Sequence, residues 1–114
     1  SIIYFTFNYY GSNEKRYNEE FEIKVYFIIT ELINNILKHS KATIGNITLE
    51  ERNNQLIINI EDNGNGFDST KTQADGFGLT QIKARVKSLK GRITISSKID
   101  TGTLIYIKLQ IPQR

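Results

Sequence analysis

Three short polar motifs follow one another along this chain, and together they describe a pocket for a nucleotide and its metal ion. Glu31 and Asn35 belong to the first motif, Asp62 opens the second, and the glycines Gly76 and Gly78 form the third. An amide oxygen is a hard ligand that suits Mg²⁺, a carboxylate can accept a proton, and glycines at the start of a helix let phosphate approach. No single motif suffices, so the prediction depends on their order and on the elements that carry them.

The first motif is predicted to lie along one side of a long helix. At about 100° per residue, Glu31, Asn35 and Lys38 fall within an arc of roughly 60°, with His39 at its edge. Asn35 would bind Mg²⁺, Glu31 would orient a water or accept a proton, and Lys38 would offset phosphate charge. Taken alone, such a row is more often a solvated helix face, and a histidine at the end of a helix more often interacts with the helix dipole.

The second motif places a carboxylate at the end of an alternating strand. Side chains alternate with a period of two, so one face of that strand carries Leu56, Ile58, Ile60 and Asp62. If this face is buried, Asp62 points inward and needs a hydrogen-bond donor. The amine of adenine is a suitable donor, whereas the oxygen of guanine would be repelled. Gly64 and Gly66 would let the loop turn and approach a flat ring. The alternatives are an aspartate that caps its own turn and a calcium loop, for which the later acidic ligands are missing.

The third motif, Gly76-Phe77-Gly78, leads directly into a helix that begins near Leu79. Free N–H groups and the positive end of the helix dipole make such a place an anion site. The spacing does not match the Rossmann fingerprint, because Gln81 stands where a third glycine would be. The preceding stretch, residues 67–74, has almost no apolar anchor. It is predicted to be either a lid that a ligand orders or a plain connection.

The apolar pattern predicts the elements that position these motifs. Helical spacing of apolar residues indicates helices over residues 18–39 and 79–90, the second closed by Gly91 as its C-terminal cap. Alternating and β-branched stretches indicate strands at residues 2–9, 43–50, 55–61, 92–97 and 102–110. The order favours an α+β fold, a two-layer α/β sandwich with a mixed, largely antiparallel five-stranded sheet that carries the helices on one face.

Length and composition bound the remaining possibilities. A chain of 114 residues fits one domain with a single core, and the absence of cysteine excludes disulfides and thiolate metal sites. The net charge of +3 is weaker than a nucleic-acid-binding surface usually carries, and the longest apolar run is too short to span a membrane. Because the chain has no methionine and enters a strand almost at once, we expect residues 1–114 to be a single domain of a larger protein.

With all three motifs in view, the chain resembles the catalytic ATP-binding domain of sensor histidine kinases. These belong to the gyrase–heat-shock–kinase–mismatch-repair ATPase superfamily, which has the Bergerat-type fold. The resemblance extends from about Phe21 to Pro112, and the residues that match the family's boxes are Glu31, Asn35, Lys38 and His39 (N box), Asp62, Gly64 and Gly66 (first glycine box), Gly76 and Gly78 (second), and Gly102 with Thr103 (late Gly-Thr). More narrowly, residues 38–42 and 78–85 are similar to the kinases that sense nitrate and lipid fluidity.

The resemblance implies that the domain binds ATP and Mg²⁺, with Asn35 coordinating the metal, Asp62 reading adenine, and Gly76 and Gly78 holding phosphate. Glu31 and Lys38 would take part in catalysis, Glu31 as a base or as a water-orienting group. Phosphoryl transfer needs mainly positioning and charge neutralisation, which such a set supplies. The further residues expected around the nucleotide are His39, Gly64, Gly66, Phe67, Phe77, Leu79 and Thr103.

A kinase of this kind would transfer the γ-phosphate of ATP to a histidine on a separate dimerisation domain and reach a response regulator through it. We expect a cytoplasmic domain that contacts neither nucleic acid nor membrane, whether or not the parent is membrane-anchored. No dimerisation helix with a phosphoacceptor histidine is present, and His39 is a poor substitute because it sits inside the N box. The fragment alone should therefore bind ATP without completing autophosphorylation. The Phe-containing lid motif of many sensor kinases is also absent, which suits the narrower subfamily.

Two other interpretations remain open. An anti-sigma-factor-type serine kinase shares the same boxes, and the run Lys38-His39-Ser40 argues mildly against it. A degenerate module that senses nucleotide without catalysis is the other possibility, and the intact Glu31 and Asn35 argue against such degeneracy.

Overall fold

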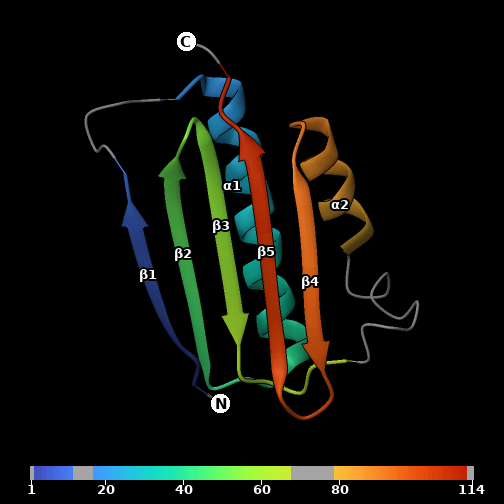
Figure 1. Ribbon diagram of the computed structural model, residues 1–114. Helices are drawn as coiled ribbons and strands as arrows, with labels where there is room; N and C mark the ends of the chain where they lie inside the picture. The colour runs from blue at the N-terminus through green and yellow to red at the C-terminus, as the bar shows by residue number, and fades with distance from the viewer. Residues whose placement is uncertain (1, 12–16, 68–78, 113–114) are drawn as a thin grey trace.

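The computed structural model describes residues 2–11, 17–67 and 79–112. A five-stranded sheet in the order β1-β2-β3-β5-β4 forms its centre, and the helices lie against one face of it (Figure 1). The strands are β1 (Tyr4–Tyr10), β2 (Ile44–Arg52), β3 (Gln55–Asp62), β4 (Arg92–Lys98) and β5 (Gly102–Gln110). The predicted two-layer α/β sandwich is confirmed.

Strand pairing is antiparallel except at one edge, where β1 runs parallel to β2. The β2–β3 hairpin turns through Asn53 and Asn54, whose φ angles of 54° and 63° suit the twist of the flanking strands. β3 pairs with β5 and not with β4, so the end of β3 lies beside the start of β5. The predicted mixed, largely antiparallel five-stranded sheet is therefore confirmed.

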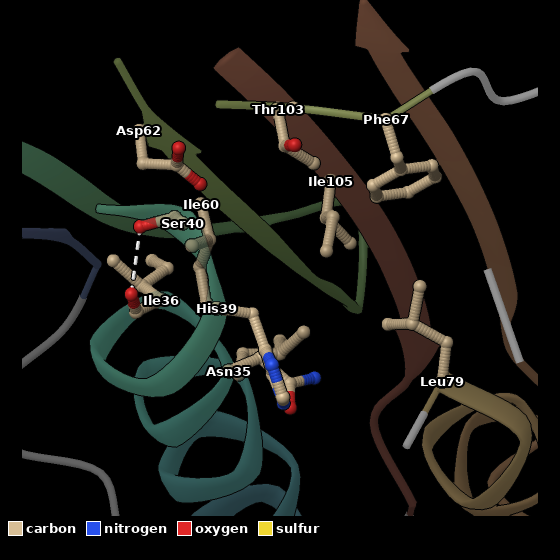
Figure 2. Close-up of a pocket in the computed structure, with 12 residues that line it drawn as sticks. Asn35, Ile36, His39, Ser40, Ile60, Asp62, Phe67, Leu79, Thr103 and Ile105 are labelled. Atoms are coloured by element: carbon tan, nitrogen blue, oxygen red, sulfur yellow. Dashed lines mark hydrogen bonds between the residues drawn. The ribbon is translucent and has the colours of Figure 1, made fainter. Parts of the chain in front are cut away.

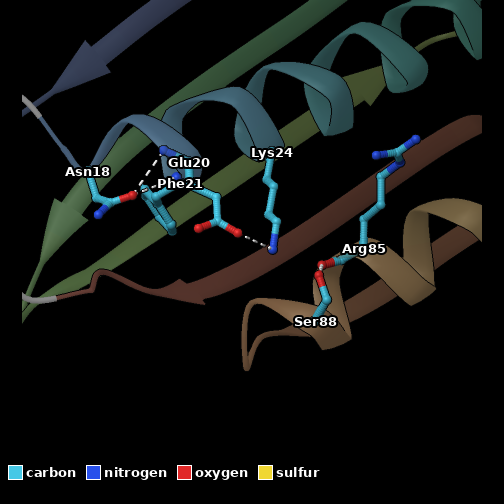
Figure 3. Close-up of polar contacts among 6 residues, drawn as sticks. All are labelled: Asn18, Glu20, Phe21, Lys24, Arg85 and Ser88. Carbon is cyan, nitrogen blue, oxygen red and sulfur yellow. Dashed lines mark hydrogen bonds and ion pairs between the residues drawn. The ribbon is translucent and has the colours of Figure 1, made fainter.

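The first helix, α1 (Glu19–Asn35), begins at a well-formed cap. The side-chain oxygen of Asn18 accepts hydrogen bonds from the N–H groups of Glu20 and Phe21, at 2.9 and 3.3 Å (Figure 3). These bonds satisfy two of the donors that the start of a helix leaves open. One turn on, Glu20 pairs with Lys24 at 3.3 Å on the exposed side.

The C-terminal part of this helix changes its period, which the sequence did not predict. Its last residues form a π-helical turn, η1 (Ile36–Ser40), in which hydrogen bonds span five residues instead of four. Lys41 then takes a φ of 54° and ends the helix. The predicted helix over residues 18–39 is right in extent, but its geometry after Asn35 is different.

The second helix, α2 (Leu79–Ser88), is closed by another residue than the predicted Gly91. Lys90 takes the left-handed conformation, with a φ of 56°, and the next N–H, that of Gly91, donates to the carbonyl of Val86 at 2.9 Å. This is the Schellman arrangement. A Cβ on Gly91 would lie 2.6 Å from the Leu109 side chain, so glycine is needed there for close packing against β5 and not as the cap.

The core lies between the helices and the sheet. α1 contributes Phe21, Val25, Ile28 and Leu32, and α2 contributes Leu79, Ile82 and Val86. They pack against inward-facing strand residues that include Ile58, Ile60, Ile105, Ile107 and Leu109. Because Ile58 and Ile60 face this core, the alternation of the strand turns Asp62 toward the same side. No helix within the described residues is long and apolar enough to cross a membrane.

Candidate functional site

A pocket opens at the end of the sandwich where α1 and β3 finish and β5 and α2 begin (Figure 2). Its cavity volume is ≈ 50 Å³, and the pocket is open to solvent on one side. Asp62 and Thr103 lie on its sheet side, and Asn35 and His39 on its helix side (Figure 2). An apolar slot with a few converging polar groups is the usual form of a small-molecule site. The remaining lining residues are Leu32, Ile36, Ser40, Ile60, Gly66, Phe67, Leu79 and Ile105.

Asp62 is half-buried at the end of β3, and strand pairing sets Thr103 opposite it on β5. One carboxylate oxygen, Oδ1, accepts the N–H of Gly64 at 2.8 Å. Burial raises the pKa of Asp62 and the nearby Glu61 adds to this, while the bond from Gly64 acts against it. Asp62 therefore both caps its own turn and faces the pocket. Its other oxygen, Oδ2, accepts no hydrogen bond from the described residues and is left for a ligand.

The two glycines after Asp62 allow close approach of backbone segments. A Cβ on Gly64 would lie 2.2 Å from the carbonyl oxygen of Ser40, and the N–H of Asn65 donates to that oxygen at 2.6 Å. Gly66 has a φ of 62°, and a Cβ there would meet the carbonyl oxygen of Lys98 at 2.1 Å. The loop is thus fastened between the end of η1 and the end of β4. Gly66 lines the pocket, whereas Gly64 supports Asp62 from outside the lining.

Asn35 projects from α1 into the pocket (Figure 2). Its amide nitrogen is buried and has no hydrogen-bond partner among the described residues, which is costly unless a ligand completes the site. No group of three metal-binding His, Cys, Asp or Glu side chains gathers in the described part of the chain. An oxygen of a bound ligand would satisfy this amide nitrogen, and the amide oxygen of the same side chain is a hard donor of the kind that suits Mg²⁺.

Glu31 and Lys38 do not line the pocket, although the sequence sets them in a row with Asn35. Glu31 is half-buried and Lys38 is exposed. Residues 36–40 turn with the wider π-helical period, so Lys38 is rotated away from Asn35 and His39 takes the place beside it. The catalytic roles of Glu31 and Lys38 stay predictions. Gly76, Phe77, Gly78 and most of the predicted lid lie outside the described residues.

Sequence reasoning missed one serine that lines the pocket and a second that contacts a lining residue from the next strand. Ser40 lines the pocket, and its hydroxyl donates to the carbonyl of Ile36 at 2.6 Å. Ser97 on β4 contacts the hydroxyl of Thr103 at 2.7 Å and accepts the N–H of Phe67 at 2.8 Å. The alternation of Ile93, Ile95 and Ser97 along β4 was the signal for an inward-facing Ser97, but it does not reveal which strand lies next to β4.

Known proteins resemble this chain both in sequence and in three-dimensional structure. Residues 20–113 match the family described as "Histidine kinase-, DNA gyrase B-, and HSP90-like ATPase". The chain is 37% identical over 109 residues to the signal transduction histidine-protein kinase/phosphatase DegS of Brevibacillus brevis, and 35% identical over 103 residues to DegS of Bacillus subtilis (strain 168). These matches cover 96% and 88% of this chain but only 28% and 27% of the relatives.

Two solved structures share the architecture. The Erythrobacter litoralis EL346 blue-light activated histidine kinase aligns with a TM-score of 0.74 at 19% identity, over 96% of this chain and 36% of that protein. The Acinetobacter baumannii histidine kinase AdeS aligns with a TM-score of 0.67 at 26% identity, over 80% of this chain and 47% of that protein. The sheet and helices described above thus recur in histidine kinases, each of which is much longer than this chain.

Proposed function

Because this chain belongs to the family of histidine kinase-, DNA gyrase B- and HSP90-like ATPases, we propose that it is the ATP-binding catalytic domain of a bacterial two-component sensor histidine kinase. Members of this family bind ATP, and the role in a larger sensor kinase is the part that we propose. One observation carries it: the half-buried carboxyl of Asp62 faces the same pocket as the buried amide of Asn35.

The sheet side of the pocket would hold adenine. Oδ2 of Asp62 would accept one hydrogen of the adenine amine, while Oδ1 stays bonded to Gly64. Ile60 and Ile105 beside it offer an apolar surface for the ring. Guanine has a carbonyl oxygen where adenine has the amine, so it would face the carboxylate acceptor to acceptor. Adenine selectivity would follow from this penalty.

The helix side of the pocket would hold the phosphates. Asn35 would offer its amide oxygen to Mg²⁺, and His39 and the glycines Gly76 and Gly78 would approach the phosphate chain. A Mg²⁺ ion held there would supply positive charge that offsets the charge developing on the phosphates. Glu31 would act as a base or orient a water from the edge of the site, and Lys38 would add positive charge.

The phosphoryl acceptor would come from elsewhere in the parent protein. The chain spans about 28% of the length of the DegS relative from Brevibacillus brevis, and a dimerisation domain with a phosphoacceptor histidine would lie in the remainder of such a protein. Residues 1–114 would then be one domain of that kinase. We place it in the cytoplasm, where it would meet ATP and act on a response regulator indirectly.

Calorimetry on this chain tests the nucleotide pocket. Mg-ATP should bind about 100-fold more tightly than Mg-GTP, because guanine would leave Asp62 facing an acceptor. Asp62→Asn should abolish that preference, since an amide can donate as well as accept. Asp100→Asn is the matched control, because Asp100 is exposed in the β4–β5 turn. Equal affinity for both nucleotides, or an Asp62→Asn variant that binds like the wild type, would refute the assignment.

A second assay tests the transfer step. The chain is mixed with the dimerisation domain of its parent and Mg-ATP, and labelled phosphate is analysed for acid lability. Phosphohistidine is acid-labile, so we expect label that acid removes and that Asn35→Ala prevents from forming. Acid-stable phosphoserine would favour the serine-kinase interpretation. Nucleotide binding with no transfer would favour a sensing module.

A further inference from the structure

Strand pairing lines up one row of residues across the sheet at the pocket. Asp62 on β3 lies opposite Thr103 on β5, and Thr103 lies opposite Ser97 on β4. All three are half-buried. Neighbours in such a row approach within about 5 Å between Cβ atoms. Ser97 does not line the pocket itself; β5 separates it from Asp62, and its hydroxyl contacts that of Thr103.

The hydroxyl of Ser97 makes contacts on three sides. It accepts the N–H of Phe67 at 2.8 Å, it donates to the carbonyl of Gly102 at 3.2 Å, and it lies 2.7 Å from the hydroxyl oxygen of Thr103. A serine hydroxyl has one proton to donate. All three contacts are therefore satisfied together only when Thr103 is the donor in the bond between the two hydroxyls.

This direction of donation determines what Thr103 offers to a ligand. If its proton is used on Ser97, only lone pairs remain for the pocket. Thr103 then stands beside the carboxylate of Asp62 as a second acceptor. Two acceptors side by side complement an amine that carries two hydrogens, as the amine of adenine does, and they oppose a carbonyl oxygen.

We propose that Ser97 is a positioning residue that orients the Thr103 hydroxyl as an acceptor and thereby sharpens the preference of the pocket for a purine with a 6-amino group. The inference rests on the proposed function, because it requires that the pocket binds adenine nucleotides. Ser97 acts on the base only through Thr103. It is a specificity-determining residue outside the ligand's reach.

The test compares Mg-ATP with Mg-ITP, whose hypoxanthine carries an oxygen in place of the amine. In the Ser97→Ala variant, the Thr103 hydroxyl is free to turn its proton toward the pocket. ATP affinity should fall by up to about 10-fold, the effect of losing one hydrogen bond, while ITP affinity should stay the same or rise, because the freed hydroxyl can donate to the oxygen of hypoxanthine. The ratio of the two affinities is the decisive readout, because a general loosening of the pocket would weaken both nucleotides alike.

Two further variants serve as controls on the same strand. Ser97→Thr keeps a hydroxyl at this position, so it should restore the ATP-to-ITP ratio. Ser96→Ala removes a hydroxyl from the exposed, opposite face of β4 and should leave both affinities unchanged. Thermal unfolding of each variant shows whether it is folded at the temperature of the titrations.

A double variant tests whether Ser97 works through Thr103. In a Thr103→Val background, Ser97→Ala should leave the ATP-to-ITP ratio where Thr103→Val alone puts it. Independent, additive effects would overturn the inference, as would a Ser97→Ala variant with the wild-type ratio or with equal losses for both nucleotides. If the wild type itself shows no preference for ATP, the proposed function falls and this inference with it. If only Ser97→Ala fails to respond, the proposed function stands.

Discussion

The two ends of α1 differ in whether their polar groups have hydrogen-bond partners within the described part of the protein. At the N-terminal end, Asn18 caps the first turn (Figure 3), and the phenol of Tyr17 donates to Glu51 at 2.5 Å. At the C-terminal end, the amide nitrogen of Asn35 is buried without a partner among the described residues, and Asp62 keeps a half-buried carboxyl with a raised pKa. The protein satisfies the first end by itself, whereas the second has groups that a ligand would complete.

This contrast separates the residues that stabilise the fold from those that bind. Tyr17 also packs edge to face on Phe21, with ring centroids 5.5 Å apart, so it fastens the start of the helix to both β2 and the core. A domain tolerates a few unsatisfied groups at a functional site when the rest of the structure is consistent. Substitutions near Asn18 should therefore change stability and spare affinity, and substitutions near Asn35 should do the reverse.

The largest effect is expected for Asn35→Ala. Losing the only described amide in the pocket should weaken Mg-ATP binding on the order of 100-fold, or about 3 kcal/mol. The free energy of unfolding should stay the same or rise, because the variant removes a buried group without a partner. Titration calorimetry and urea unfolding measure the two quantities. Asn34→Ala, one residue away on the exposed side, is the control and should bind like the wild type.

A loss of stability in Asn35→Ala would contradict the view that the C-terminal end of α1 serves binding and not stability. It would mean that the amide supports the π-helical turn after it and that its role is structural. Unchanged affinity would have the same consequence for the metal site.

At the opposite end, Tyr17→Phe should destabilise the domain by about 2 kcal/mol. The hydroxyl donates to a carboxylate, and hydrogen bonds to charged groups are stronger than neutral ones. Burial, foremost, and the bond to Glu51 raise the pKa of Tyr17, so the phenol stays protonated and able to donate. Tyr26→Phe is the control, since Tyr26 is 64% exposed. Nucleotide affinity should not change in either variant, and a shift beyond about 3-fold would show that the two ends are coupled.

A smaller effect is expected for Asn18→Ala, which removes the cap of α1. Loss of a side-chain cap typically costs about 1 kcal/mol, because the N–H groups of Glu20 and Phe21 lose their acceptor. Asn18→Asp keeps an acceptor and should retain the stability of the wild type. Chemical denaturation compares the three proteins. An alanine variant as stable as the aspartate variant would show that water replaces the cap without cost.

The sequence predicted the elements better than it predicted their last turns. Alternation was sufficient to place Asp62 on the buried face, since a period of two leaves only two choices. The helical angle between Asn35 and Lys38 could not be predicted, because a π-helical turn depends on how the end of a helix packs and no residue type indicates it. Residue type alone predicts Gly91 as the helix cap, whereas its neighbour Lys90 adopts the left-handed conformation. Ser97 needed the strand order, which local patterns do not contain.

The smallest effect is expected on the stability of Asp62→Asn as a function of pH. This variant connects the residues that stabilise the fold with those that bind the ligand. Burial holds the pKa of Asp62 above its ordinary value of 3.8, so the folded state favours the neutral acid. At a pH below that ordinary value, Asp62 is protonated in both the folded and the unfolded state, so it does not lower the free energy of unfolding. As the pH rises through the raised pKa, the unfolded chain ionises more readily, and the folded state loses stability that it does not regain at neutral pH.

Asp62→Asn removes this penalty while keeping an oxygen for Gly64. The variant should therefore match the wild type at about pH 4 and become more stable toward about pH 7. Since solvent still reaches the carboxyl, the gain should be about 1 kcal/mol at most. Urea unfolding across this range measures it, and Asp100→Asn should show no such trend. A variant that is less stable at neutral pH would mean that the turn holds the ionised form. A gain in stability together with lost adenine preference would identify Asp62 as a group kept for its ligand at the expense of the fold.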